Sequence, residues 1–189
     1  MDKNNAPALS PAQLKSALWA DRLVQVYALI LGHRIGELPE RLAAADGDAQ
    51  ITSYDCVLPG ALSPQRRRTA PYLVALKPES TFTDWLLNKA AGEFADWGVL
   101  VRTRLSFLGL RSHSRDCLEG RLPDGQPIVL EWMDPAVLRL LLPLAPGDQV
   151  EELLGPLETL VMTGTERWTL CSQQFGRLQM QDQPLMAGA

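Results

Sequence analysis

Hydrophobic and polar positions follow two different periods along the first hundred residues, so the pattern predicts strands and helices in alternation. Short apolar runs with β-branched or aromatic members are typical of buried strands, and such runs lie at residues 23–30, 71–76 and 97–101. Residues 51–58 predict a further strand. Apolar residues at helical spacing fill the intervals. Helices are therefore expected at residues 10–20, 36–45, 80–92 and 105–118.

Local motifs mark where several helices begin. Ser10 and Gln13 have the spacing of a capping box, in which each side chain bonds a backbone N–H at the helix start. Thr81 is a candidate cap for the helix at 80–92. Asp134 directly before Pro135 predicts another start, because aspartate caps helices and proline fits the first turn.

The second half of the chain predicts a hairpin and further short elements. Asp124-Gly125 lies between two β-like runs, 117–122 and 127–132, and this dipeptide is a strong signal for a tight hairpin turn. The other elements expected there are helices at 134–142 and 149–154 and candidate strands at 157–162 and 168–171.

Together these elements predict an α/β protein. We expect a mixed sheet with flanking helices in a larger N-terminal lobe, residues 10–120. A hairpin and helices would form a smaller, mainly helical C-terminal lobe at 121–175. Residues 1–9 and 176–189 are expected to be flexible tails.

Composition narrows the class of protein. The 189 residues are 46% hydrophobic and carry a net charge of -4. A chain of this size buries roughly 70% of its unfolded surface, which is enough for one core and excludes bulk disorder. The negative net charge argues against general affinity for nucleic acid. No apolar run approaches the roughly 20 residues that span a bilayer, so membrane insertion is not expected.

The cysteines and the N-terminus bear on the cellular compartment. Cys56, Cys117 and Cys171 are odd in number, widely spaced and without a Cys-x-x-Cys motif, which argues against a zinc site and favours a reducing compartment. No apolar signal region follows the start of the chain. A cytoplasmic location is therefore expected.

Catalytic motifs are sparse. The sequence has two histidines, no Gly-x-Ser-x-Gly elbow and no glycine-rich nucleotide loop. His113 and Cys117 are one turn apart on a predicted helix, and His33 follows a strand, where a turn role is the simpler interpretation. We expect neither enzymatic activity nor a cofactor. The remaining enzyme hypothesis is a small hydrolase that uses Cys117 or His113.

Candidate partner contacts follow from residue type and position, since aromatic and arginine side chains are frequent anchors of protein interfaces. The five tryptophans are spread along the chain, and core packing explains most of them. Trp132 and Met133 lie at a predicted strand end, and the predicted helices nearby add further contacts. The three arginines of the 59–70 loop are a second candidate, or a solvated charge run. The predicted contacts are Trp132, Met133, Arg139, Gln149, Glu152 and Leu153, with Arg66, Arg67 and Arg68 as the second group.

Several segments together resemble one family. The stretches 26–32 (VYALILG), 70–76 (APYLVAL), 97–101 (WGVLV) and 129–138 (VLEWMDPAVL) follow its order and spacing, as do Phe82 to Leu87 and Leu154-Gly155-Pro156. By these motifs the chain is identified as a member of the domain-of-unknown-function 4123 family, the type VI secretion effector chaperones or adaptors. The resemblance covers about residues 23–168.

The main departure from the family pattern is local. Where the family usually has Arg-Phe-Tyr-Asp-Pro-Arg, this chain has Glu131-Trp132-Met133-Asp134-Pro135-Ala136, so no role of those two arginines carries over. Asp134-Pro135 is retained.

The resemblance implies a cytoplasmic, non-catalytic binding protein. Its partner would be a cognate toxic effector, which it helps to load onto the spike of the secretion machine, a valine-glycine repeat protein or its tip. The alternative is an immunity protein that binds a toxin to neutralise it.

Overall fold

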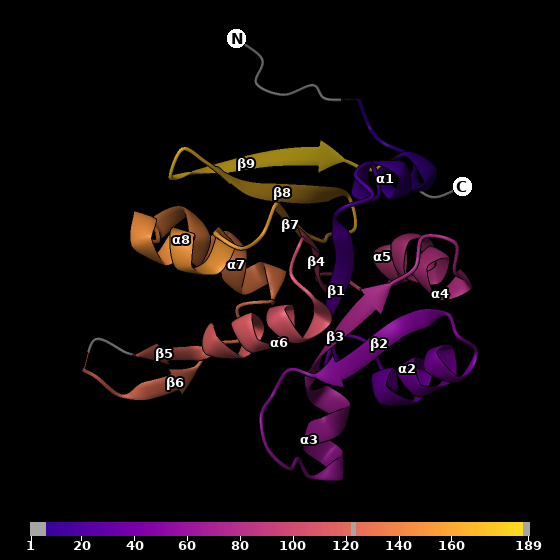
Figure 1. The fold of residues 1–189 in the computed structure, drawn as a ribbon, viewed down its shortest axis with the longest axis horizontal. Coiled ribbons are helices and arrows are strands. Elements are labelled where there is room, and N and C mark those ends of the chain that lie inside the picture. Colours follow the sequence, from indigo (N-terminus) through magenta and orange to yellow (C-terminus); the bar gives the residue numbers. More distant parts are fainter. Residues whose placement is uncertain (1–6, 122–123, 187–189) are drawn as a thin grey trace.

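The computed structural model describes residues 7–121 and 124–186, and its central feature is one seven-stranded sheet (Figure 1). Every neighbouring pair of strands in it is antiparallel. A separate hairpin of β5 (Glu119–Arg121) and β6 (Pro127–Val129) projects from the body. In spatial order the sheet strands are β2 (Ile51–Cys56), β3 (Pro71–Leu76), β1 (Gln25–Leu31), β4 (Gly98–Thr103), β7 (Thr159–Met162), β8 (Arg167–Gln174) and β9 (Arg177–Pro184).

The strands β3, β1 and β4 are buried on both faces. Successive side chains of a strand point to opposite faces, so two apolar layers must cover them. On β1, Ala28 and Ile30 belong to one apolar cluster and Leu29 and Leu31 to the other. This double burial explains why the sequence shows continuous apolar runs here instead of alternation.

Two helical layers cover these two faces (Figure 1). The first contains α1 (Pro11–Leu18), α2 (Leu38–Gly47) and a continuous helical segment of α4 (Thr81–Asp84), the π-helix η1 (Trp85–Ala90) and α5 (Ala91–Glu93). The second contains α6 (Phe107–Asp116), α7 (Pro135–Leu141) with the 3-10 turn η2 (Leu142–Leu144), and α8 (Gly147–Leu154). Among the described residues, no helix combines the length and the apolar character needed to cross a bilayer.

Helix starts follow the predicted motifs with one exception. The Ser10 and Gln13 side chains form the reciprocal capping box, and Asp134 caps α7. The cap of α4 is Ser80 instead of Thr81, because the Ser80 hydroxyl accepts a hydrogen bond from the backbone N–H of Thr83. The Thr81 hydroxyl instead donates to the side chain of Gln50, at 3.0 Å.

The C-terminal half differs from the prediction. The sheet is antiparallel and not mixed, and its strands β7 and β8 come from the region expected to be mainly helical, while β9 comes from the predicted tail at 176–189. The expectation of a mainly helical C-terminal part is wrong, because after the hairpin the strands β7, β8 and β9 contain more residues than the helices α7 and α8. Since β7 pairs with β4, one sheet runs through both predicted lobes, 10–120 and 121–175.

Two further segments have more structure than the sequence indicated. β9 lies within the predicted tail at 176–189 and pairs along its whole length with β8. The predicted loop at 59–70 contains α3 (Pro64–Thr69), which Ser63 caps. Residues 1–6, 122–123 and 187–189, which include parts of both predicted tails and of the hairpin turn, lie outside the described residues.

Candidate functional site

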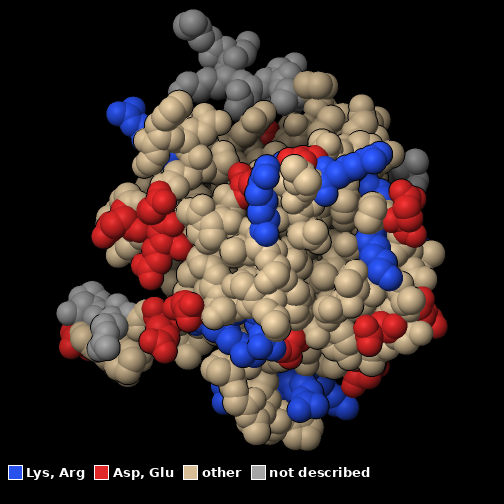
Figure 2. Space-filling model, viewed as in Figure 1, with Lys and Arg blue, Asp and Glu red and all other residues tan. Residues whose placement is uncertain are grey.

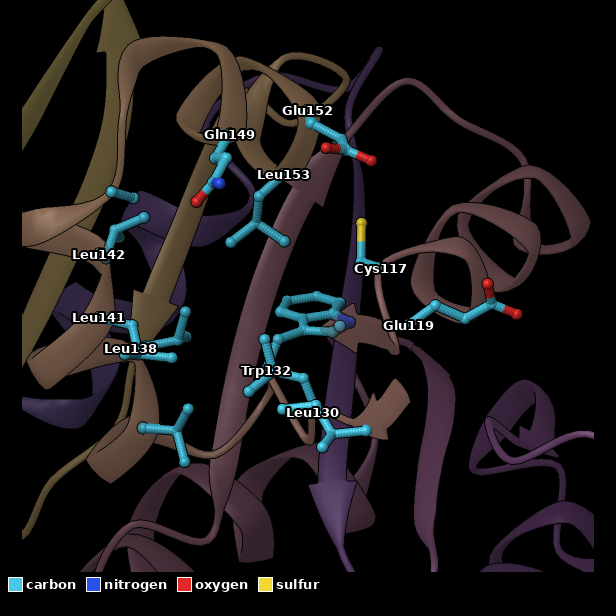
Figure 3. A pocket seen from close by; sticks show the side chains of 14 residues that line it. Cys117, Glu119, Leu130, Trp132, Leu138, Leu141, Leu142, Gln149, Glu152 and Leu153 are labelled. Atoms are coloured by element: carbon cyan, nitrogen blue, oxygen red, sulfur yellow. The ribbon is translucent and has the colours of Figure 1, made fainter. Parts of the chain in front are cut away.

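An apolar groove of about 540 Å³ lies between the β5–β6 hairpin, α7–η2 and α8 (Figure 3). Each of these elements contributes one side of it. The lining side chains are Ile128 and Leu130 of the hairpin side, Val137, Leu138, Leu141 and Leu142 of α7–η2, and Gln149, Glu152 and Leu153 of α8, with Trp132, Cys117, Glu119, Gly120 and Ala145 between them.

The hairpin reaches the groove through its base. Its strands pair in register, Glu119 opposite Val129 and Gly120 opposite Ile128. The backbone N–H of Leu130 donates to the carbonyl of Leu118 at 2.7 Å and so extends the pairing towards α6. This pairing directs Ile128 and Leu130 into the groove.

Trp132 forms the inner side of the groove. Its side chain is buried, and its Nε1 donates a hydrogen bond of 3.1 Å to the carbonyl of Ser114 in α6. This hydrogen bond fixes the orientation of the indole against α6. A ligand in the groove can contact only the indole atoms that line it. Met133 is fully buried and does not line the groove, which removes it from the candidate contact surface.

The helix α7 presents leucines in two directions. Leu138 and Leu142 pack into the apolar cluster below the groove. Leu141 lines the groove with 46% of its surface exposed, and Leu140 and Leu144 are 71% and 83% exposed. Aliphatic side chains clustered at this exposure on one element are typical of a surface that a partner covers.

Gln149, Glu152 and Leu153 lie together on the α8 side of the groove (Figure 3). Leu153 is half-buried and adds to the apolar lining, while Gln149 and Glu152 are exposed at the rim. Of the predicted contact residues, the structure thus brings these three and Trp132 to one site.

A family model described as a domain of unknown function, DUF4123, matches residues 26–152, more than half of the chain. The chain belongs to the DUF4123 family. A search of the curated proteins and a search of the solved structures found no match to this chain. The DUF4123 match runs from β1 into α8, so it includes the hairpin, α7 and every lining residue of the groove except Leu153.

Glu131, where the sequence resemblance leads us to expect an arginine, does not line the groove. Its carboxylate is 3.9 Å from Nδ1 of His33. The His33 Nε2 is 3.9 Å from Asp134, which also has Arg34 at 3.5 Å. These contacts join the end of β1 to the start of α7, which supports the turn role that the sequence indicates for His33.

Arg139 does not line the groove of this DUF4123 chain. Its guanidinium contacts the Asp96 carboxylate at 2.6 Å and the Thr163 carbonyl at 2.7 Å. Asp96 lies just before β4 and Thr163 just after β7. Arg139 therefore holds α7 to the sheet, and its contact with a partner stays a prediction.

The second predicted group is separate from the groove. Arg66, Arg67 and Arg68 lie on α3, are exposed, and do not line the groove. Arg67 instead lines a more polar cavity with Tyr72 and Asp55, and the Arg68 guanidinium is 3.9 Å from the Glu40 carboxylate.

The groove lining includes the thiol of Cys117. Burial, with the charges of Glu152 and Asp116 adding to it, raises the pKa of Cys117 to about 11, so the thiol is protonated at neutral pH. Both ring nitrogens of His113 are 3.9 Å from Cys117 Sγ, while Nε2 contacts the Leu153 carbonyl at 3.0 Å. Within the described ranges, no three His, Cys, Asp or Glu side chains are grouped to hold a metal ion.

Sequence reasoning missed the exposed leucines Leu140, Leu141 and Leu144 and the rim carboxylate Glu119. A signal for the leucines was present. The run 137–144 has leucine at five positions and is too apolar for a helix with a single buried face. Glu119 had no comparable signal, because only the position of the hairpin brings it to the groove.

Proposed function

We propose that this protein is an effector chaperone, or adaptor, of a type VI secretion system. In this role it binds a cognate toxic effector in the cytoplasm and helps to load it onto the spike, a valine-glycine repeat protein or its tip. Membership of the DUF4123 family supports the proposal through the chaperone role that the sequence resemblance implies.

The observation that carries the proposal is the apolar groove with its exposed leucines. A cargo-binding protein needs an apolar centre that excludes water and a polar rim that keeps the free protein soluble. Leu130, Leu141 and Leu153 offer such a centre above the buried Trp132, and Glu119, Gln149 and Glu152 offer such a rim. An apolar groove with a polar rim suits a polypeptide segment that must later be released.

Co-purification with the toxin encoded beside this gene tests the proposal. The decisive variant is Leu141→Ser, which makes the groove polar at an exposed position and leaves the core intact. Its matched control is Leu108→Ser, because Leu108 is a leucine of α6 that is 62% exposed and does not line the groove. We expect Leu141→Ser to lose the effector and its secretion, and Leu108→Ser to retain both.

Two results would contradict the proposal. One is secretion of the toxin at the normal level from cells without this protein. The other is protection of cells that express the toxin domain alone, which is what an immunity protein would provide.

A further inference from the structure

Two carboxylates line the groove, Glu119 on the hairpin side and Glu152 on the α8 side (Figure 3). Among the residues that the structure describes, neither has a Lys, Arg or His nitrogen within 4.0 Å. The same holds for Asp116, Asp148 and Glu151, which belong to the neighbouring helices α6 and α8. Within the described part of the chain, no ion pair therefore compensates the two carboxylates at the groove.

The described arginines of the neighbouring helices are directed elsewhere. On α6, Arg111 contacts Asp55 and Arg115 contacts the carbonyls of Cys56 and Val57, while on α7 Arg139 contacts Asp96. Among the residues that the structure describes, no Lys or Arg lines the groove. In Figure 2 acidic side chains gather over α8 and near the base of the β5–β6 hairpin, while basic ones lie over α6, around α3 and across the upper part of the view.

The negative field reaches the interior of the groove. The charges of Glu152 and Asp116 both contribute to the raised pKa of Cys117, whose side chain lines the groove. A positive charge brought to the rim would therefore be attracted, and the attraction would act at a site where apolar side chains limit solvent screening.

We propose that the groove binds an amphipathic helix of the effector, with aliphatic residues on one face and lysine or arginine at the flanking positions. The proposal rests on the assignment of the groove as the effector site. A helix satisfies its own backbone hydrogen bonds, so it can bury an aliphatic face against Leu130, Leu141 and Leu153 without the edge pairing that a strand requires. Its flanking cations would then meet Glu119 and Glu152.

Two synthetic peptides test this inference with the full chain. Both have about 18 residues and the same leucine positions at i, i+3, i+4 and i+7, and their polar positions carry lysine in one and glutamate in the other. Fluorescence anisotropy of labelled peptides gives the dissociation constants at low and at physiological salt. We expect the lysine peptide to bind at least about tenfold more tightly, with an advantage that shrinks as salt rises.

Matched variants locate the binding. Glu119→Gln with Glu152→Gln should weaken the lysine peptide about tenfold, since two rim ion pairs are lost. Glu79→Gln with Glu93→Gln removes the same charge from exposed, unpaired carboxylates near α4 and α5, on the other side of the sheet, and should leave affinity unchanged. Leu141→Ser should weaken both peptides.

Equal binding of the two peptides, or equal effects of the two double variants, would overturn the inference. So would the absence of peptide binding by a protein that still co-purifies the effector through Leu141, and in that case the proposed function would stand. Conversely, tight groove binding of the lysine peptide without any effect on secretion would contradict the proposed function and leave the chemistry of the groove as inferred.

Discussion

The Nε1 of Trp132 donates a hydrogen bond of 3.1 Å to the backbone carbonyl of Ser114. This contact connects the segment just before α7, which contains Trp132, to the helix α6. Trp132 is 2% exposed and is part of the apolar cluster beneath the groove. The indole therefore packs in the core between α6 and α7, and its hydrogen bond to Ser114 holds the start of α7 close to α6.

Replacement of Trp132 by phenylalanine should destabilise the fold through the lost hydrogen bond. The matched control is Trp168→Phe, because the buried Nε1 of Trp168 has no hydrogen-bond partner among the described residues. Trp132→Phe should lower the free energy of unfolding by about 1–3 kcal/mol more than Trp168→Phe, since it leaves a carbonyl unpaired. Urea unfolding measures both values. Equal losses would show that the hydrogen bond to Ser114 does not stabilise the protein.

Arg139 should matter for stability and not for the partner. Its contacts with Asp96 and the Thr163 carbonyl join α7 to the ends of β4 and β7, so Arg139→Ala should cost about 1–3 kcal/mol in the free energy of unfolding. Effector co-purification at a temperature where the variant is folded should stay normal. A folded, stable variant that no longer binds the effector would restore the role that the sequence predicts for this arginine.

Gly98 begins β4 with a φ of +153°, at a point of very close approach. A Cβ there would lie 2.0 Å from the Leu29 carbonyl oxygen on the neighbouring strand. Gly98→Ala should therefore cost more than about 3 kcal/mol, because the central strands must separate. Gly92→Ala is the control, since a Cβ at Gly92 meets no atom within 4 Å. Thermal melts of equal midpoint would contradict this reading of β4.

Alkaline pH should destabilise the protein through Cys117. Burial raises the pKa of this thiol from its ordinary value of 9.0 to about 11, so between these values the unfolded chain loses the proton and the folded chain keeps it. The contribution of this thiol to the free energy of unfolding should therefore be complete below pH 9 and should be lost as the pH rises from 9 to 11. Cys117→Ala should make the decline shallower. Urea unfolding at several pH values checks this, and parallel curves for wild type and variant would contradict it.

The local parts of the fold were predictable because their causes are local. The strand at 71–76, the Ser10 capping box, the Asp134 cap and the Asp124-Gly125 hairpin all rest on residues a few positions apart. The extension of the sheet by β7, β8 and β9 rests instead on pairing between distant segments, such as Val99 with Met162. Such pairing leaves no short-range signal in one sequence.

Some residues of the candidate site could likewise be predicted from the sequence, and others depend on the fold. Trp132, Gln149, Glu152 and Leu153 belong to segments that the sequence singled out, and the fold brings them to one groove. The contact of Arg139 with Asp96 could not be foreseen, because 43 residues separate the two. The exposure of Leu141 also depends on which face of α7 meets the sheet, and this is set by packing.

The most direct test of the groove is site-specific photo-crosslinking in cells that make both the protein and its effector. A photoreactive phenylalanine analogue is placed at Leu141 in the groove, at Leu108 on α6 and at Arg67 on α3, three exposed positions on different elements. Mass spectrometry then identifies the crosslinked peptides. The account predicts crosslinks from position 141 to a lysine- or arginine-flanked helix of the effector. Crosslinks to the effector from position 67 or 108 but not from 141 would contradict it.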